Sequence, residues 1–146
     1  MDKQLISILK EGHHSLVVSN KEIHTYNGKG VTDLYTLINS DPSLLYGSQI
    51  ADKIVGKAAA SLIIKAKASE LYAETISHPA LEMLKQYNIP TNYGTIVPNI
   101  LNRDSTGLCP LETRCLQCST PNECYNQITT FITEIKTKHQ PQCKQH

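Results

Sequence analysis

The spacing of apolar residues changes along the chain between a helical period and an alternating, strand-like period. The clearest helical pattern covers residues 53–68, where Ile54 and Ala58 begin a row that a helix places on one face. A second apolar row runs beside it, so the face is broad and indicates a buried helix. Asp52 is predicted to be the N-cap, since a carboxylate accepts hydrogen bonds from the free amides of a first turn. Gly56 lies inside the predicted helix at a cost of about 1 kcal/mol relative to alanine, which indicates a close approach by another group.

Short apolar runs bounded by turn residues predict the strands of a sheet. In chain order these runs are a hairpin at 15–19 and 22–26, followed by 46–51, 71–76 and 91–93. Helical spacing predicts further helices over 5–9, 31–38, 77–87 and 108–118, and another from 121 onward. Ser77 is the predicted cap of one helix, and Thr120 with Glu123 forms a capping-box pattern at another. Strands that alternate with helices in this way imply an α/β protein with a mixed sheet and helices on both faces.

Length and composition describe one ordinary folded domain. At roughly 100–200 residues per domain, 146 residues form a single domain, which we place at 1–138, with 139–146 as a frayed tail. Lys and Arg number 14 against 13 Asp and Glu, so a basic surface for nucleic acid is not expected. No apolar stretch reaches the ~18 residues of a membrane span. Residues 1–11 lack the apolar core of a signal peptide, so a cytoplasmic location is expected.

Three segments carry a resemblance to a known family. They are Ala51–Ala60 (ADKIVGKAAA), Ile76–Leu81 (ISHPAL) and Asn102–Glu112 (NRDSTGLCPLE). Together they resemble the small bacterial family called domain of unknown function 1893, over about Ser15 to Ile135. The resemblance implies a three-layer α/β/α fold of the cytidine-deaminase type, with a mixed sheet of about five strands. It further implies that the helices after Asp52 and Ser77 correspond to the two whose N-termini hold zinc in true deaminases.

The sequence lacks the residues that zinc-dependent deamination requires. That chemistry needs an H-x-E motif at one helix start and P-C-x-x-C at the other, which supply three zinc ligands and a proton shuttle. None of the six histidines is followed two residues later by glutamate, and Cys109 precedes its proline rather than following it. Hydrolytic deamination by a zinc-bound water is therefore not expected, and no resident metal or other cofactor is predicted.

The residues that remain at the predicted helix starts favour binding of a small polar metabolite or a nucleotide. Helix N-termini attract anions, and arginine suits phosphate or carboxylate. The candidate ligand-binding residues are Asp52, Lys53, Ser77, His78, Asn102, Arg103, Thr106 and Gly107. The alternative is that Asp52 and Ser77 only cap helices, that Lys53 is only solvated, and that His78 only begins a helix.

Cys109 suggests a second function, an enzyme of different chemistry. It directly precedes Pro110, where the start of a helix favours a thiolate. In this hypothesis Cys109 is the catalytic nucleophile, and Lys53, His78 or Asp52 moves protons. The alternatives are that Cys109 is a packed, inert thiol and that Glu112 closes a capping box at its own helix.

The cysteines after residue 108 suggest a third function. Cys109, Cys115, Cys118 and Cys124 are enough to hold zinc or an iron–sulfur cluster, and Cys115 with Cys118 has the spacing of a redox pair. Only one tight pair is present, whereas zinc sites usually have two, so incidental thiols on one helix are the alternative. The expected partners are a small-molecule ligand and a second copy in a homodimer, without nucleic acid or membrane.

Overall fold

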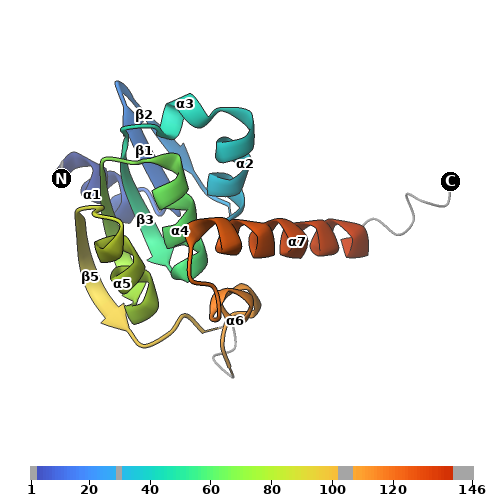
Figure 1. Ribbon diagram of the computed structural model, residues 1–146. Helices are drawn as coiled ribbons and strands as arrows, with labels where there is room; N and C mark the ends of the chain where they lie inside the picture. The colour runs from blue at the N-terminus through green and yellow to red at the C-terminus, as the bar shows by residue number, and fades with distance from the viewer. Residues whose placement is uncertain (1–2, 29–30, 102–106, 140–146) are drawn as a thin grey trace, which may run out of the picture.

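The computed structural model describes residues 3–28, 31–101 and 107–139, and these form a five-stranded mixed sheet with helices on both faces (Figure 1). The strands are β1 (Leu16–Asn20), β2 (Glu22–Tyr26), β3 (Gln49–Val55), β4 (Glu70–Ser77) and β5 (Thr91–Val97). The helices are α1 (Lys3–Glu11), α2 (Thr32–Ser40), α3 (Pro42–Leu45), α4 (Lys57–Ala66), α5 (His78–Gln86), α6 (Pro110–Cys115) and α7 (Pro121–His139). The predicted mixed α/β architecture is confirmed. The predicted C-terminal tail, apart from His139, lies outside the described residues.

The sheet order is β2-β1-β3-β4-β5, with an antiparallel hairpin on one side and three parallel strands on the other. The predicted hairpin is confirmed, and it turns at Lys21, whose φ is 70°. The strands β3, β4 and β5 follow one another across the sheet through α4 and α5. Right-handed crossovers that run in the same direction across a sheet place their helices on the same face. The two helices of these crossovers, α4 and α5, accordingly pack in one hydrophobic core.

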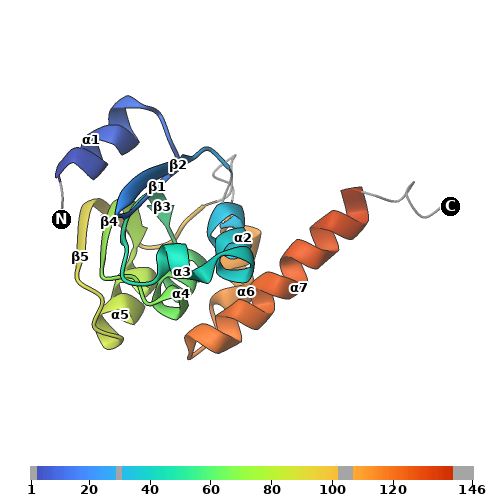
Figure 2. The ribbon, with the colours of Figure 1, turned by 90° about the horizontal axis from the view of Figure 1, so that it is seen from above.

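Two separate cores cover the two faces of the sheet. The larger core contains buried residues of α2, α4, α5, α6 and α7. On the opposite face, α1 is the one helix among the described residues that packs against the sheet (Figure 2). That smaller core consists of Leu5, Leu9, Val17, Ala51 and Tyr72. Since neighbouring strand residues point to opposite faces, Ile50 faces the larger core and Ala51 the smaller one.

The boundary between β3 and α4 differs from the predicted one. The strand runs to Val55 and the helix begins only at Lys57, so Asp52 lies inside β3 and is not an N-cap. The reason is non-local: Asp52 is paired with Leu16 of β1 on one side and with Ala73 of β4 on the other. Hydrogen bonding to two neighbouring strands outweighs the local capping signal of a carboxylate before an apolar run.

Other local signals are confirmed. The Ser77 hydroxyl accepts a hydrogen bond from the amide of Ala80 at 3.2 Å, as expected of an N-cap. In the capping box of α7, Glu123 N donates to Thr120 Oγ1 at 3.2 Å and Thr120 N donates to Glu123 Oε1 at 3.3 Å. The last strand is longer than predicted, because β5 extends to Val97 as an exposed edge strand. Among the described residues, no helix is long and apolar enough to cross a membrane.

Candidate functional site

A cavity of about 510 Å³ lies beside the C-terminal half of β3, between the start of α4 and the start of α6. Its size is typical of small-molecule sites. Its lining residues come from the position before β1, the connection from β2 to α2, β3, the start of α4, the segment that leads into α6 and the first residues of α6. They are Ser15, Gly28, Val31, Asp52, Lys53, Ile54, Gly56, Ala58, Ala59, Ile100, Leu101, Cys109, Pro110, Leu111 and Glu112. Most are apolar, so the few polar groups determine what the cavity can bind.

Asp52 is the most unusual of these polar groups. Asp52 is only 7% exposed, and its carboxyl oxygen Oδ1 accepts a long hydrogen bond, 3.4 Å, from the amide of Ile54. The pKa of the Asp52 carboxyl is raised to about 8, chiefly by burial. The amides of Ile54 and Lys53 lower this pKa, and the Asp33 carboxylate makes the smallest contribution, which raises it. At neutral pH the carboxyl is therefore largely protonated. It then offers one O–H donor and one C=O acceptor to the cavity.

Glu112 occupies the N-terminus of α4, where a bound anion was expected. Its Oε1 accepts from the amide of Lys57 at 3.0 Å and its Oε2 from that of Ala58 at 3.2 Å. A Cβ at Gly56 would overlap this carboxylate, which is the close approach that the glycine indicated. The predicted capping box between Glu112 and its own helix is therefore wrong, because the carboxylate caps a helix 55 residues earlier in the chain. A phosphate cannot take these two amides without displacing Glu112.

The structure does not bring Ser77 and His78 to this cavity. Ala73, the β4 partner of Asp52, lies four residues before Ser77, which corresponds to about 13 Å along an extended strand. Ser77 is fully buried as the cap of α5. His78 is exposed and lines a separate hollow of about 580 Å³ with Pro79 and residues 96–99. The expectation that two helix starts share one hollow is therefore wrong for Asp52 and Ser77.

Of the remaining predicted residues, two border the cavity, one does not, and three lie outside the described residues. Lys53 borders the cavity, but its side chain is exposed, and alternation along β3 directs it to the face opposite Asp52. Cys109 borders the cavity, is partly buried, and donates its amide to the Ile100 carbonyl at 3.0 Å. Gly107 is exposed and lines neither hollow. The other loop residues fall outside the described residues: Asn102, Arg103 and Thr106.

Sequence reasoning missed one wall of the cavity, which Ser15, Gly28 and Val31 form. The amide of Gly28 donates to Asp33 Oδ2 at 2.8 Å, and a Cβ at Gly28 would meet that carboxylate. A glycine at this position leaves room for the Asp33 carboxylate. The glycine was visible in the sequence, but only as a break in the apolar pattern. Its proximity to Asp52 depends on the pairing of β1 with β3, which no local pattern encodes.

The four cysteines predicted as metal ligands do not form one group. Cys109 borders the cavity, whereas Cys115, Cys118 and Cys124 interact with one another between α6 and α7. Over the part of the chain that the structure describes, no set of three or more His, Cys, Asp or Glu side chains is arranged to hold a metal ion.

The fold and the cavity define a mixed α/β protein with a cavity of about 510 Å³ beside β3. A family model described as "Domain of unknown function (DUF1893)" matches residues 4–132, so the chain belongs to the DUF1893 family. It is similar to the crystal structure of a DUF1893 family protein, TM1506 from Thermotoga maritima, at 28% identity and a TM-score of 0.81. The similarity covers 89% of this chain and 91% of that protein. No curated protein matches the chain.

Proposed function

We propose that the protein binds a small, uncharged polar molecule of about nucleoside size in the Asp52 cavity. The observation that carries this proposal is the Asp52 carboxyl, which is more than nine-tenths buried and lines the cavity. Among the described residues, no lysine or arginine forms an ion pair with it. A buried polar group costs free energy unless it is hydrogen-bonded, so a ligand that bonds Asp52 would recover part of that cost.

The hydrogen-bonding capacity of Asp52 narrows the ligand class. A protonated carboxyl donates one hydrogen bond and accepts another in one plane, which matches a cyclic amide or amidine edge such as that of a nucleobase. Glu112 already holds the first amides of α4, and Asp33 adds negative charge near Asp52. These carboxylates disfavour a phosphate deep in the cavity, so the proposal moves from the expected nucleotide toward a nucleoside or base.

We infer in addition that the fold is related to the cytidine-deaminase arrangement but works without its zinc chemistry. The resemblance of residues 51–60 and 76–81 supports this relation, and the missing H-x-E and P-C-x-x-C motifs support the loss of zinc chemistry. Ligand binding does not depend on this relation. The homodimer, the absence of nucleic acid and the cytoplasmic location stay predictions.

The test is a thermal-shift screen of nucleobases, nucleosides and nucleotides against three proteins: wild type, Asp52→Asn and Asp52→Val. We expect a compound that raises the wild-type Tm at pH 6 and binds at least tenfold more weakly at pH 9, where Asp52 is ionised. Asp52→Asn keeps one donor and one acceptor and should bind at both pH values. Asp52→Val should bind at least tenfold more weakly at both, since one or two hydrogen bonds are worth about 1–3 kcal/mol.

His78→Ala is the matched control for this screen, because His78 was predicted in the same site but lines a different hollow. Its ligand affinity should equal that of wild type. A ligand that binds Asp52→Val as tightly as wild type would contradict the proposal, as would a screen in which no compound shifts Tm.

A second candidate, an enzyme with Cys109 as nucleophile, is favoured by one observation: Cys109 and Asp52 line the same cavity. An ionised Asp52 carboxylate would accept the thiol proton before attack on an electrophilic carbon. The pH dependence of Cys109 alkylation, followed by mass spectrometry in wild type and Asp52→Asn, tests this candidate. A faster rate in wild type above pH 8 supports it, and equal, slow rates in both proteins exclude it.

A further inference from the structure

Three cysteines that lie outside the cavity meet between α6 and α7. Cys115 is the last residue of α6, Cys118 lies in the connection, and Cys124 lies at the start of α7. Cys115 and Cys124 are fully buried, whereas Cys118 is partly exposed. The Cys124 sulfur interacts with the thiols of both Cys115 and Cys118, and the Cys118 thiol also donates to the carbonyl oxygen of Arg114 at 3.9 Å. We call Cys115, Cys118 and Cys124 the thiol cluster.

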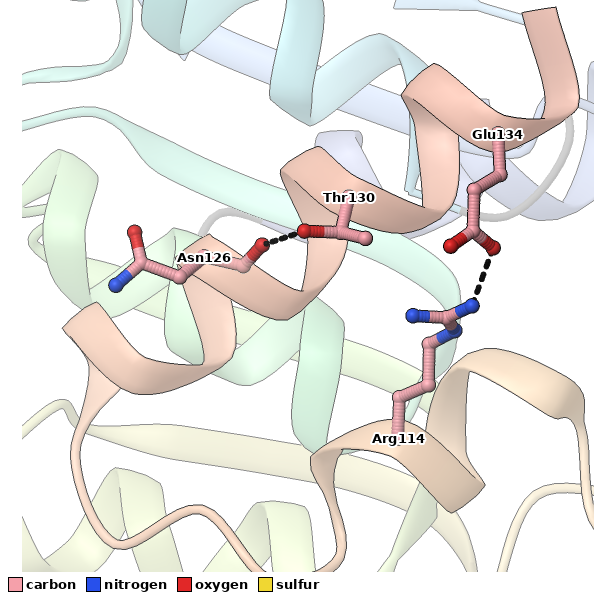
Figure 3. Close-up of polar contacts among 4 residues, drawn as sticks. All are labelled: Arg114, Asn126, Thr130 and Glu134. Carbon is pink, nitrogen blue, oxygen red and sulfur yellow. Dashed lines mark hydrogen bonds and ion pairs between the residues drawn. The ribbon is translucent and has the colours of Figure 1, made fainter. Parts of the chain in front are cut away.

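The connection that carries Cys118 is held in place from two sides. The Lys57 ammonium donates to the carbonyl oxygens of Leu116 at 3.1 Å and Cys118 at 2.5 Å. An ion pair between Arg114 of α6 and Glu134 of α7 joins the two helices (Figure 3). The backbone at Cys118 is thus fixed in a connection between two packed helices. Thiols on segments that are already fixed lose little chain entropy when they are joined.

The cluster has an uneven distribution of charge. Hydrogen bonding from Cys115 lowers the pKa of Cys124, and Cys118 and the Lys57 ammonium lower it further, against the effect of burial. Hydrogen bonding to Cys124 and burial raise the pKa of Cys115, and burial raises that of Cys118. Ser61 also lowers the pKa of Cys124, but only slightly. Its single hydroxyl proton is donated to the Ala58 carbonyl oxygen at 2.6 Å and is not available to Cys124. Negative charge in the cluster therefore belongs on Cys124.

We propose that the thiol cluster is a thiol–disulfide exchange site, in which Cys118 reacts with a small-molecule disulfide and Cys124 resolves the product. The Cys124 thiolate takes the proton of Cys118, and the Cys118 sulfur attacks the disulfide RSSR, which forms Cys118–S–S–R and expels RS⁻. That RS⁻ takes the proton from Cys124 and leaves as RSH. The restored Cys124 thiolate attacks the Cys118 sulfur, which forms the Cys118–Cys124 disulfide and expels a second RS⁻. The two cysteines lose two electrons, and RSSR gains both.

Cys118 is the entry point because it is the part-exposed member of the cluster, and a reagent in solution cannot reach the other two directly. Cys115 stays reduced and serves as a hydrogen-bond donor to Cys124. The pair that becomes oxidised is therefore Cys118 and Cys124, whereas the sequence spacing had suggested Cys115 and Cys118.

The test treats the full-length protein with hydroxyethyl disulfide, alkylates the remaining thiols and maps the peptides. Cleavage after Arg114, Glu123 and Glu134 separates Cys124 from Cys115 and Cys118, so a Cys118–Cys124 bond appears as two linked peptides. We expect this linked pair in wild type and in Cys115→Ala. In Cys124→Ala we expect a stable hydroxyethyl adduct on Cys118, and in Cys118→Ala a loss of at least tenfold in cluster oxidation.

If a buried variant fails to fold, fragmentation of the linked wild-type peptides decides the outcome, because it shows whether Cys118 or Cys115 carries the bond to Cys124. A Cys115–Cys124 bond would overturn the proposal. A bond between Cys115 and Cys118 would leave one unlinked peptide two mass units lighter, and would overturn the proposal. An unresolved adduct on Cys118, or a cluster that stays fully reduced while Cys109 reacts, would also overturn it.

Discussion

Replacing Asp52 by asparagine is expected to remove a large pH dependence from the stability of the protein. Burial raises the pKa of the folded carboxyl from 3.8 to about 8, so between these values the folded state holds a proton that the unfolded chain has released. The wild-type free energy of unfolding must therefore fall as pH rises from about 4 to 8, and level off above that. At about 1.4 kcal/mol per pH unit, the loss from this group is on the order of 5 kcal/mol.

Urea unfolding of wild type and Asp52→Asn at several pH values between 4 and 9 measures this effect. Other groups titrate in both proteins, so the difference between the two free energies isolates Asp52. As pH rises, the free energy of unfolding of Asp52→Asn should increase relative to that of wild type. The control is Asp41→Asn, at an exposed carboxylate, whose free energy of unfolding should stay within about 0.5 kcal/mol of wild type. A difference between wild type and Asp52→Asn that is independent of pH would show that Asp52 is already ionised in the fold.

The features that were predictable from the sequence are those that depend on neighbouring residues. The hairpin around Lys21, the Ser77 cap and the capping box of Thr120 and Glu123 are all formed within a few residues of chain, and all three are confirmed. Their physical causes are a turn, a hydroxyl acceptor and a reciprocal pair of hydrogen bonds. Each cause acts over a distance that a short sequence window contains.

The start of α4 was mispredicted because its determinants lie far away in the chain. Asp52 carries a strong local capping signal, but pairing with β1 and β4 keeps it in a strand. The cap is supplied by Glu112, and only the folded chain brings that carboxylate to Lys57. The candidate site was affected in the same way. Asp52 and Cys109 do line one cavity, whereas the assumed position of Asp52 at a helix start led to the wrong partner, Ser77.

Loss of the Glu112 carboxylate is expected to destabilise the protein by about 3 kcal/mol, because one part-buried and one buried amide of α4 would lose a charged acceptor. Each such bond is worth about 1.5–3 kcal/mol. The variant is Glu112→Ala, and the measurement is the free energy of unfolding in urea. Glu123→Ala is the matched control, since Glu123 also caps a helix but is exposed. Its expected cost is about 1 kcal/mol or less.

A double-mutant cycle with Gly56 decides whether Glu112 acts through this contact. The backbone of Gly56 has φ −96° and ψ −174°, which other residues adopt, so only the carboxylate demands a glycine there. Gly56→Ala alone should destabilise the fold by overlap with Glu112. Combined with Glu112→Ala, it should cost much less, because the carboxylate is gone and the two changes are coupled. Strictly additive costs would mean that the two residues do not interact, and that α4 obtains its cap elsewhere.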